Sequence, residues 1–473
     1  MRARTTWLSE AEKSLVLEQA LHILEHTGMR MTGSKALPRL AEAGALVEAA
    51  SGLVRFPPEL VTSALARCPR EFLLAGASSE RDAFVTADGG FLCTPSGCAA
   101  HTLDLETGRR RESTLADLRT HIAVLDELPQ LDVQWTTVTA NDVPRDEREL
   151  REYFAVLTET GKHVTFVDCP THVDEVRRIF EVLGGDLERF RARPRVSTLV
   201  TTASPLQVEG AILDVHIATA AWGAPLDIYT MAIAGATAPV TLAGTLVQGV
   251  AEFLGVATVV QTVTPGARLV FCSGSGVLDM RHTTFSLGCL ENTIMACAAV
   301  EMGHSLGVPV LTPGLSTDVK HPGVQAGWEK GLKVFPVCAT GSDLISGGMG
   351  LVDTSRTLCL PQAVIDDEIV AWVRRMAAEV EVSKDTLAVD AIAEVGPGGD
   401  FLGLRETRTR IRAGEHFMPA IATRLPYEAW EAAGLTEVDV ARERVDEILR
   451  ARAGRAPDLS EDQLAELASI CGA

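Results

Sequence analysis

The sequence predicts an α/β protein built around a (β/α)8 TIM barrel. From about residue 90 onward, short apolar or β-branched runs alternate with longer segments of helical periodicity, the pattern of a parallel sheet. Eight such runs occur, roughly 30 to 42 residues apart, and eight strand–helix units match a barrel. Several runs are apolar throughout, as strands buried on both faces require. An open doubly wound sheet has the same periodicity and stays open as the alternative.

Residues 1–90 are expected to form an N-terminal helical segment. The stretch LSEAEKSLVLEQALHILEHTG carries leucines near helical spacing and stops at Gly28, a common left-handed helix end. The stretch PPELVTSALARCP predicts a shorter helix that starts on Pro57 and Pro58 and ends before Pro69.

Residues 91–380 are expected to form the barrel. Its strands begin near Phe91, Val133, His163, Val196, Leu226, Arg268, Val308 and Leu344. Between two of them, THVDEVRRIFEVLGG places its apolar residues on one helical stripe and ends in two glycines. After the first strand, CTPSGCAAHTLDLETGRRR predicts an inserted hairpin that turns at Thr107-Gly108.

Residues 381–473 are expected to form a C-terminal helical extension packed on the barrel, because no low-complexity linker separates them from it. The glycine loop EVGPGGDFLG lacks the Lys and Ser/Thr of a phosphate loop, so its glycines are interpreted as turn formers. The helical ends of the chain are also compatible with a homo-oligomer.

Charge and composition exclude several classes of function. The formal net charge is −20, from 63 acids against 43 bases, which disfavours binding to nucleic acid or to an anionic membrane. The N-terminus lacks the apolar core of a signal peptide, and none of the ten cysteines forms a CxxC pair. The apolar segment 239–263 contains Gln248, Glu252 and Gln261, which favours a buried helix over a membrane span. A cytoplasmic protein is expected.

The chemistry of a barrel lies at the C-terminal ends of its strands, so residues that follow the strands mark the expected site. Asp168 follows the third strand, and Cys169-x-x-His172 has the spacing of a zinc-ligand pair. No second pair follows, and a helix starts near Thr171, so a structural or capping role is favoured over a metal. After the sixth strand, CSGSGVLDMR lacks the third glycine of a dinucleotide loop.

Two charged pairs follow later strands. Asp279 and Arg281 come after the sixth strand, and Asp318 and Lys320 come after the seventh. A salt-bridged rim or a solvated turn explains such pairs without any function, whereas barrel geometry also points them into the mouth. The chain has no GxSxG and no HExxH motif. The residues alone therefore predict a barrel with a polar mouth and no named reaction.

Eight stretches spread over most of the chain resemble, in order and spacing, the trimethylamine:corrinoid methyltransferase family. They are TLDLETGRRRESTLADL, TANDVP, ASPLQ, AGATAPVTLAGTLVQGVAEFLG, DMRHTTFSLGCLE, STDVKHPGVQAGWEKGL, VIDDEIV and EVGPGGDFLG. The resemblance implies a (β/α)8 barrel that moves a methyl group from a methylated amine to the cobalt of a separate corrinoid-binding protein. The trimethylamine enzymes carry pyrrolysine. This sequence contains no nonstandard residue and resembles the non-pyrrolysine branch, which is associated with quaternary amines such as glycine betaine.

The implied reaction sets two tasks for the barrel mouth. A quaternary ammonium expels a neutral amine, so the site has to align the reactants and needs no proton donor. It must hold a cation with aromatic faces or carboxylates and any substrate carboxylate with Arg or Lys. Expected substrate-binding residues are Trp135, Asp168, Tyr229, Phe271 and Arg281, and expected catalytic residues are Asp279, Asp318 and Lys320. Asp318 and Asp279 also suit the cation, and Lys320 the carboxylate. Taken alone, each aromatic ring is better explained as plain core.

Two departures from the family pattern leave alternative functions open. Glu406-Thr407 stands where many relatives have His-Thr, and Gly323 stands where an acid is frequent. Either implies a different substrate or a changed contact with the corrinoid protein. The alternatives are a barrel methyltransferase that uses a methylthiol, methyl ether or sulfonium, with or without zinc, and a non-catalytic relative that binds a methylated amine.

Overall fold

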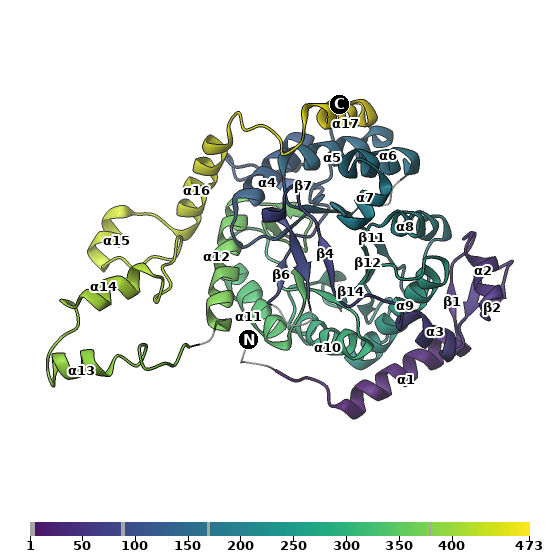
Figure 1. The fold of residues 1–473 in the computed structure, drawn as a ribbon, viewed down its shortest axis with the longest axis horizontal. Helices are drawn as coiled ribbons and strands as arrows, with labels where there is room; N and C mark the ends of the chain where they lie inside the picture. Colours follow the sequence, from purple (N-terminus) through teal and green to yellow (C-terminus); the bar gives the residue numbers. More distant parts are fainter. Residues whose placement is uncertain (1–4, 87–89, 168–170, 379) are drawn as a thin grey trace.

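The centre of the molecule is a barrel of eight parallel strands (Figure 1). The computed structural model describes residues 5–86, 90–167, 171–378 and 380–473. In barrel order the strands are β6 (Leu92–Cys93), β18 (Leu344–Ser346), β17 (Val310–Pro313), β14 (Leu269–Ser273), β12 (Leu226–Thr230), β11 (Val196–Thr201), β10 (His163–Phe166) and β9 (Val133–Trp135). Each matches one of the eight predicted strands, so the predicted α/β barrel is confirmed.

The two ends of this strand order meet, so the sheet is nearly closed. The backbone N–H of Asp132, beside β9, donates to the carbonyl oxygen of Cys93 in β6 over 2.9 Å. Farther along, Ala99 and Val138 form a parallel bridge. The open doubly wound sheet is therefore excluded.

Helices surround the barrel and bury the outer faces of the strands. They are α4 (Leu115–Glu127), α5 (Arg145–Glu159), α6 (Val173–Gly184), α7 (Leu187–Ala192), α8 (Gly210–Trp222), α9 (Leu242–Val263), α10 (Leu290–Leu306), α11 (Val324–Thr340) and α12 (Leu360–Ala377). Within the described residues, α9 is one helix long and apolar enough to cross a bilayer, but 83% of its apolar window is buried inside the protein. The expected buried helix is confirmed.

The N-terminal segment differs from the expectation, because it contains strands as well as helices. Its helices are α1 (Glu10–His26), α2 (Leu37–Glu42) and α3 (Pro58–Leu65), with a 3-10 turn η1 (Ser79–Arg81). Its strands are β1 (Met29–Arg30), β2 (Leu46–Glu48), β3 (Leu53–Arg55), β4 (Phe72–Leu74) and β5 (Ala83–Val85). These strands have two or three residues each, too few to show an alternating pattern in the sequence.

The β4–β5 hairpin closes one end of the barrel. Phe72, Leu74 and Val85 pack against inward-facing residues of the barrel strands, among them Val133 and Leu311. The backbone after β4 bonds to residues that lie just before β10 and β11. The hairpin therefore lies at the N-terminal ends of the strands, and a cavity can form only at the opposite end.

Short strands build the rim at that opposite end. They are β7 (His101–Leu103), β8 (Arg110–Glu112), β13 (Ile233–Ala234), β15 (Gly276–Asp279), β16 (Thr284–Ser286), β19 (Leu351–Val352) and β20 (Thr357–Leu358). The antiparallel pair β7–β8 confirms the predicted inserted hairpin.

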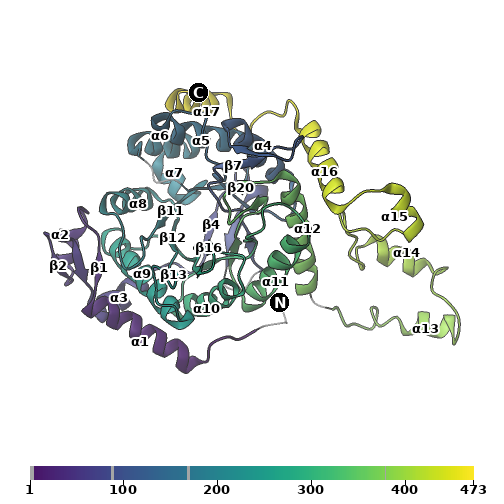
Figure 2. The same ribbon diagram turned by 180° about the vertical axis from the view of Figure 1, so that it is seen from behind.

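The C-terminal extension has two parts with different surroundings. The helices α16 (Glu437–Arg452) and α17 (Glu461–Cys471) pack on the barrel helices, as expected. Most of residues 380–435, with α13 (Val389–Val395), α14 (Arg405–Arg412) and α15 (Tyr427–Ala433), instead projects away from the barrel (Figures 1 and 2). For these residues the expected packing on the barrel is wrong, because they have almost no buried side chains.

Candidate active site

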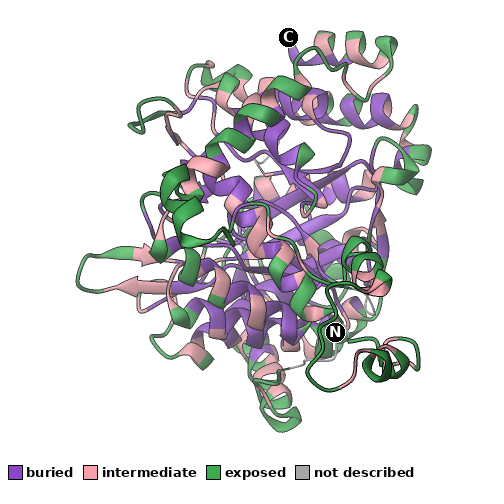
Figure 3. Cartoon of the chain, turned by 90° about the vertical axis from the view of Figure 1, so that its left-hand side faces the viewer, coloured by how far each residue is buried: buried purple, intermediate pink, exposed green. Residues whose placement is uncertain are grey.

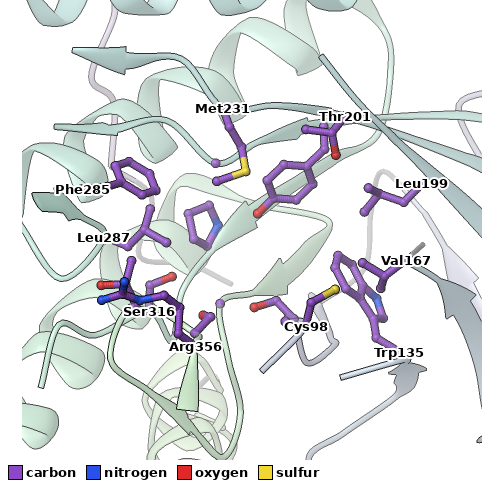
Figure 4. A pocket seen from close by; sticks show the side chains of 18 of the residues that line it. Cys98, Trp135, Val167, Leu199, Thr201, Met231, Phe285, Leu287, Ser316 and Arg356 are labelled. Carbon is purple, nitrogen blue, oxygen red and sulfur yellow. The ribbon is translucent and has the colours of Figure 1, made fainter. Parts of the chain in front are cut away.

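A cavity of about 560 Å³ lies at the C-terminal ends of the barrel strands (Figure 4). Every strand, or the loop that follows it, contributes to its wall. The wall residues on the strands and their loops include Cys98, Trp135, Val167, Leu199, Thr201, Tyr229, Met231, Gly274, Pro313, Ser316 and Gly347. Because the other end of the barrel is closed by the β4–β5 hairpin, a ligand reaches this cavity from the rim.

Three aromatic side chains line the cavity. Trp135 on β9 and Tyr229 on β12 were predicted for substrate binding, and Phe285 on β16 was not. Trp135 and Phe285 lie on opposite sides of the cavity in the view of Figure 4. Aromatic faces attract organic cations, so this wall suits a methylated ammonium group. Phe285 could not be found from the sequence, because it enters through a rim hairpin and not through a barrel strand.

Another predicted substrate-binding residue is not in this wall. Phe271 lies on the outer face of β14, where its ring packs against Phe253 of α9 with centroids 4.7 Å apart. The prediction for Phe271 is wrong, since alternate residues of a strand face opposite sides and Cys272 takes the inner face. Asp168 and Cys169 lie outside the described residues.

Asp279 and Arg281 form an ion pair on the rim hairpin. The guanidinium of Arg281 lies 2.8 Å from the Asp279 carboxylate, and the Arg281 side chain is 82% exposed. Its hydrogen bond holds the pKa of Asp279 well below the usual range. Neither residue is part of the cavity wall described above. The structure therefore places this pair as the salt-bridged rim that was the simpler interpretation.

Asp318 joins two parts of the cavity wall without lining it. Its carboxylate accepts hydrogen bonds from the Ser286 hydroxyl, from the Leu287 N–H over 3.0 Å and from the Thr354 hydroxyl over 3.0 Å. Leu287 and Thr354 both line the cavity. These contacts give Asp318 a supporting position, next to the site rather than inside it.

Lys320 supports the same wall through Asp353. Its ammonium group lies 2.5 Å from the Asp353 carboxylate, and the guanidinium of Arg356 lies 3.0 Å from it. Burial works to raise the pKa of Asp353, but the hydrogen bond from Lys320 and the charges of both cations outweigh it and lower that pKa. The Asp353 carboxylate thus binds two cationic side chains, Lys320 and Arg356, beside the cavity.

The turn that contains Asp353 is strained. Asp353, Thr354 and Ser355 have φ values of 54°, 56° and 62°, a left-handed conformation that residues other than glycine rarely adopt. The N–H groups of Asp353 and Thr354 donate to the carbonyls of Val319 and Thr317 over 2.7 and 2.9 Å. The Asp-x-Lys motif therefore holds this turn both by its backbone and by its charges.

The turn carries Arg356 into the cavity wall (Figure 4). Two Arg356 N–H groups donate to Asp353 over 3.2 and 3.0 Å. A guanidinium has five N–H donors, so three stay available to a ligand. Arg356, which was not predicted, takes the position expected for Arg281 or Lys320. The surrounding sequence, VDTSRTLCL, has no feature that distinguishes this arginine from a surface residue.

Replacing Lys320 with Met is expected to weaken binding of a carboxylate-bearing substrate and to leave the fold intact. Without Lys320, Asp353 attracts the Arg356 guanidinium more strongly and draws it from the ligand. We expect KM to rise about tenfold, equivalent to about 1.4 kcal/mol, with kcat nearly unchanged. Because Lys320 is 65% exposed, its loss should change the free energy of unfolding by less than about 1 kcal/mol. Recovery of KM in Lys320→Arg supports this role. A fall in kcat at constant KM contradicts it and favours the predicted catalytic role.

A buried cation, Lys333, holds another part of the wall. Its ammonium donates to the carbonyls of Leu287 and Ser316, the latter over 3.2 Å, and to the Asn292 side chain over 2.8 Å. Burial lowers its pKa to about 8. A lysine on an amphipathic helix such as α11 is normally expected on the face exposed to solvent. The sequence therefore did not reveal that Lys333 is buried.

Asp227 lies inside the barrel on the same face of β12 as Tyr229. Leu226 and Ile228 pack outward, so Asp227 faces inward by alternation. Burial raises its pKa to about 7. In the sequence, Asp227 is the single acid of the apolar run LDIYTMAI, a pattern that indicates a buried carboxyl group.

Asp227 makes the stability of the protein depend on pH. Its pKa in the folded chain, about 7, lies above its ordinary value of 3.8, so between these values the unfolded chain releases the proton first. The free energy of unfolding therefore falls as pH rises toward 7. Between pH 5 and pH 8 we expect the wild type to lose about 3 kcal/mol relative to Asp227→Asn. Urea unfolding of both proteins at the two pH values measures this difference. Parallel pH dependence in the two proteins contradicts the argument.

Comparison with known proteins shows the family of the chain. The family model "Trimethylamine methyltransferase (MTTB)" matches residues 2–470. The chain belongs to this family. Trimethylamine methyltransferase MttB2 of Methanosarcina mazei is 28% identical over 456 residues, covering 95% of this chain and 91% of that protein. The glycine betaine methyltransferase of Desulfitobacterium hafniense strain Y51 is 26% identical over 444 residues, covering 93% and 92%.

A solved structure is also similar, that of the Methanosarcina barkeri monomethylamine methyltransferase, with 14% identity, a TM-score of 0.48 and 92% of each chain covered. The family model and the curated relatives together show that the protein is a methyltransferase of the methylamine and betaine family. The cavity at the barrel mouth is its candidate active site.

Of the two candidate zinc ligands, Cys169 lies outside the described residues and His172 lies within them. Among the described residues, no group of three or more His, Cys, Asp or Glu side chains is arranged to hold a metal ion. His172 instead lies 3.2 Å from the carboxylate of Glu149, which also accepts hydrogen bonds from the N–H and hydroxyl of Thr171.

Proposed function

We propose that this methyltransferase moves a methyl group from a quaternary amine of the betaine class to the cobalt of a separate corrinoid protein. The observation that carries the proposal is the combination of three aromatic rings with Arg356 in one cavity. The rings suit a methylated ammonium, and Arg356 suits a carboxylate. A betaine carries both groups.

The absence of an acid from the described wall residues also fits this reaction. When a quaternary ammonium loses a methyl group, the electron pair of the broken C–N bond stays on nitrogen and a neutral tertiary amine leaves. No proton donor is needed. The reduced corrinoid supplies the nucleophile, and the cavity wall has to hold the methyl group toward the rim, where a partner protein can approach. A cytoplasmic location fits such a reduced cofactor.

Reconstitution tests the proposal. The enzyme is mixed with a corrinoid protein reduced to the cob(I) state and with glycine betaine, longer betaines, tetramethylammonium, trimethylamine or a sulfonium analogue, and cobalt methylation is followed by absorbance. We expect turnover with a betaine and none with trimethylamine. Turnover only with the sulfonium favours the alternative methyl donor. Binding without turnover, with several corrinoid proteins, favours the non-catalytic alternative.

A further inference from the structure

The turn Gly274-Ser275-Gly276 lies against two of the three aromatic side chains in the described cavity wall. It joins β14 to β15, and Gly274 is itself part of that wall. All three residues of the turn are buried, as is most of the inside of the barrel (Figure 3). In the sequence this segment has only the first two glycines of a dinucleotide loop, so its glycines need a different explanation.

The backbone conformation does not require glycine at either position. Gly274 and Gly276 do not have the left-handed φ that favours glycine, and Gly276 pairs with Ile233 of β13 as an ordinary strand residue does. A glycine inside a strand weakens it and often marks a place where another group comes close to the backbone. Here the groups that come close are aromatic rings.

Each glycine leaves the place of its missing Cβ atom to one ring. A Cβ at position 274 would lie inside van der Waals distance of Cε1 of Tyr229, and 3.0 Å from both Cζ and the hydroxyl oxygen of that residue. A Cβ at position 276 would lie 2.7 Å from Cε2 of Phe285 and would also meet the carbonyl oxygen of Ser286. Gly276 therefore serves the strand pairing of the rim hairpin as well as a ring, whereas Gly274 makes room for the Tyr229 ring alone.

The turn cannot move away from the rings, because hydrogen bonds hold it from the other side. The N–H of Gly274 donates to the carbonyl of Thr230 over 2.9 Å. The Asn292 side chain donates to the carbonyl of Ser275 over 2.6 Å and accepts from the Lys333 ammonium over 2.8 Å. Asn292 and Lys333 are both buried. A side chain added at position 274 would therefore displace the Tyr229 ring rather than the backbone.

The cavity is the direction in which the Tyr229 ring can move. Toward the closed end of the barrel, Tyr229 packs on the buried cluster that contains Cys272, Leu311 and the β4–β5 hairpin, and close packing leaves no room there. On its other side the residue borders the cavity. Carbon atoms in contact stay about 3.5 to 4.0 Å apart, so beside an alanine the ring would have to move by roughly 1 Å. That movement narrows the space for a substrate.

We infer that Gly274 is a positioning residue, which sets the width of the cation site through Tyr229 and thereby selects a nitrogen with four substituents. The inference rests on the proposed function, because it concerns the selectivity of the same cavity. A quaternary ammonium is tetrahedral and carries one more methyl group than a sulfonium of equal charge, which has three substituents and a lone pair. With the Tyr229 ring against bare backbone, the cavity keeps room for the additional methyl group.

Binding of two simple cations to the full chain tests the inference. Tetramethylammonium and trimethylsulfonium have the same fixed charge and differ by one methyl group, and calorimetry measures both affinities without a corrinoid protein. In Gly274→Ala we expect the ratio of tetramethylammonium affinity to trimethylsulfonium affinity to fall about tenfold, near the lower end of what one carbon atom contributes in an apolar pocket. The matched control is Gly314→Ala, directly after the neighbouring strand β17. A Cβ there would lie 3.4 Å from its nearest neighbours, so the ratio should stay at the wild-type value.

A second background shows whether the effect passes through the ring. Tyr229→Leu removes the atoms with which the new Cβ would collide. Adding Gly274→Ala to Tyr229→Leu should therefore leave the affinity ratio of that background unchanged, because the two substitutions act through one contact. If Gly274→Ala alone does not fold, as judged by circular dichroism, the double variant should fold, since it lacks the collision.

Several results would overturn the inference. An unchanged ratio in Gly274→Ala, or an equal fall in Gly314→Ala, shows that the space at position 274 does not set the selectivity. An equal fall in the Tyr229→Leu background, or a double variant that still does not fold, shows that the effect does not pass through the ring. If the wild type binds neither cation, the proposed cation site is wrong and the inference is wrong with it. Binding by the wild type with an unchanged ratio in Gly274→Ala overturns the inference alone.

Discussion

Arg356→Met is expected to raise KM for a betaine by about tenfold to about a hundredfold. The substitution removes charge-assisted hydrogen bonds to the substrate carboxylate, which are worth about 1.5 to 3 kcal/mol. Met keeps most of the side-chain length, so the turn at residues 353–355 and its contacts with Val319 and Thr317 should persist. The measurement is the dependence of cobalt methylation, or of calorimetric binding, on betaine concentration.

A second ligand separates loss of the carboxylate contact from general damage. Tetramethylammonium has the cationic group without the carboxylate, so its binding should change little in Arg356→Met. Arg110→Met is the matched control, because Arg110 also pairs with Asp353, at 3.5 Å, but is not part of the described cavity wall. Equal losses for both ligands would contradict the assignment of Arg356 to the carboxylate.

Lys330→Met is expected to destabilise the protein by about 3 to 5 kcal/mol, the usual cost of leaving a buried charge without its partner. Lys330 and Asp366 form an ion pair of 2.6 Å with both side chains fully buried. The ammonium also donates to the carbonyls of Gly348 and Leu351 over 3.1 and 3.2 Å. These bonds fix the loop after β18, which enters the cavity wall at Gly347. Without Lys330, the Asp366 carboxylate would be buried with its charge unpaired.

Urea unfolding measures this effect, and a second substitution tests its cause. Burial raises the pKa of Asp366, so replacing it with Asn in the Lys330→Met background removes the unpaired charge and should recover part of the loss. The exposed pair Arg444–Glu447 supplies a control, since Arg444→Met should change stability by no more than about 0.5 kcal/mol. If the double variant is no more stable than Lys330→Met, the loss comes from the broken carbonyl contacts and not from the charge.

The barrel and part of its site follow from local patterns in the sequence. Eight apolar runs alternate with helical segments, and buried parallel strands need this pattern whatever the details of packing. Trp135 and Tyr229 lie on such strands, so their positions near a barrel mouth could be predicted with the strands. The inserted hairpin could also be predicted, because its turn requires a residue with positive φ and glycine adopts that conformation most easily. In the structure Gly108 has a φ of 67°.

Only the tertiary structure decided which side chains face the cavity. Phe271 and Cys272 are adjacent, and the choice between them depends on strand rotation, which no run of apolar residues reveals. Arg356 and Phe285 reach the cavity from rim hairpins whose placement depends on contacts with distant segments, such as Asp318 with Thr354. Asp318 and Lys320 stand out in the sequence as charged residues after a buried strand. Their roles could not be predicted, because their partners Thr354 and Asp353 lie more than thirty residues away along the chain. Local periodicity determined the barrel, whereas long-range hydrogen bonds and ion pairs determined the site, because those contacts form only after the chain has folded.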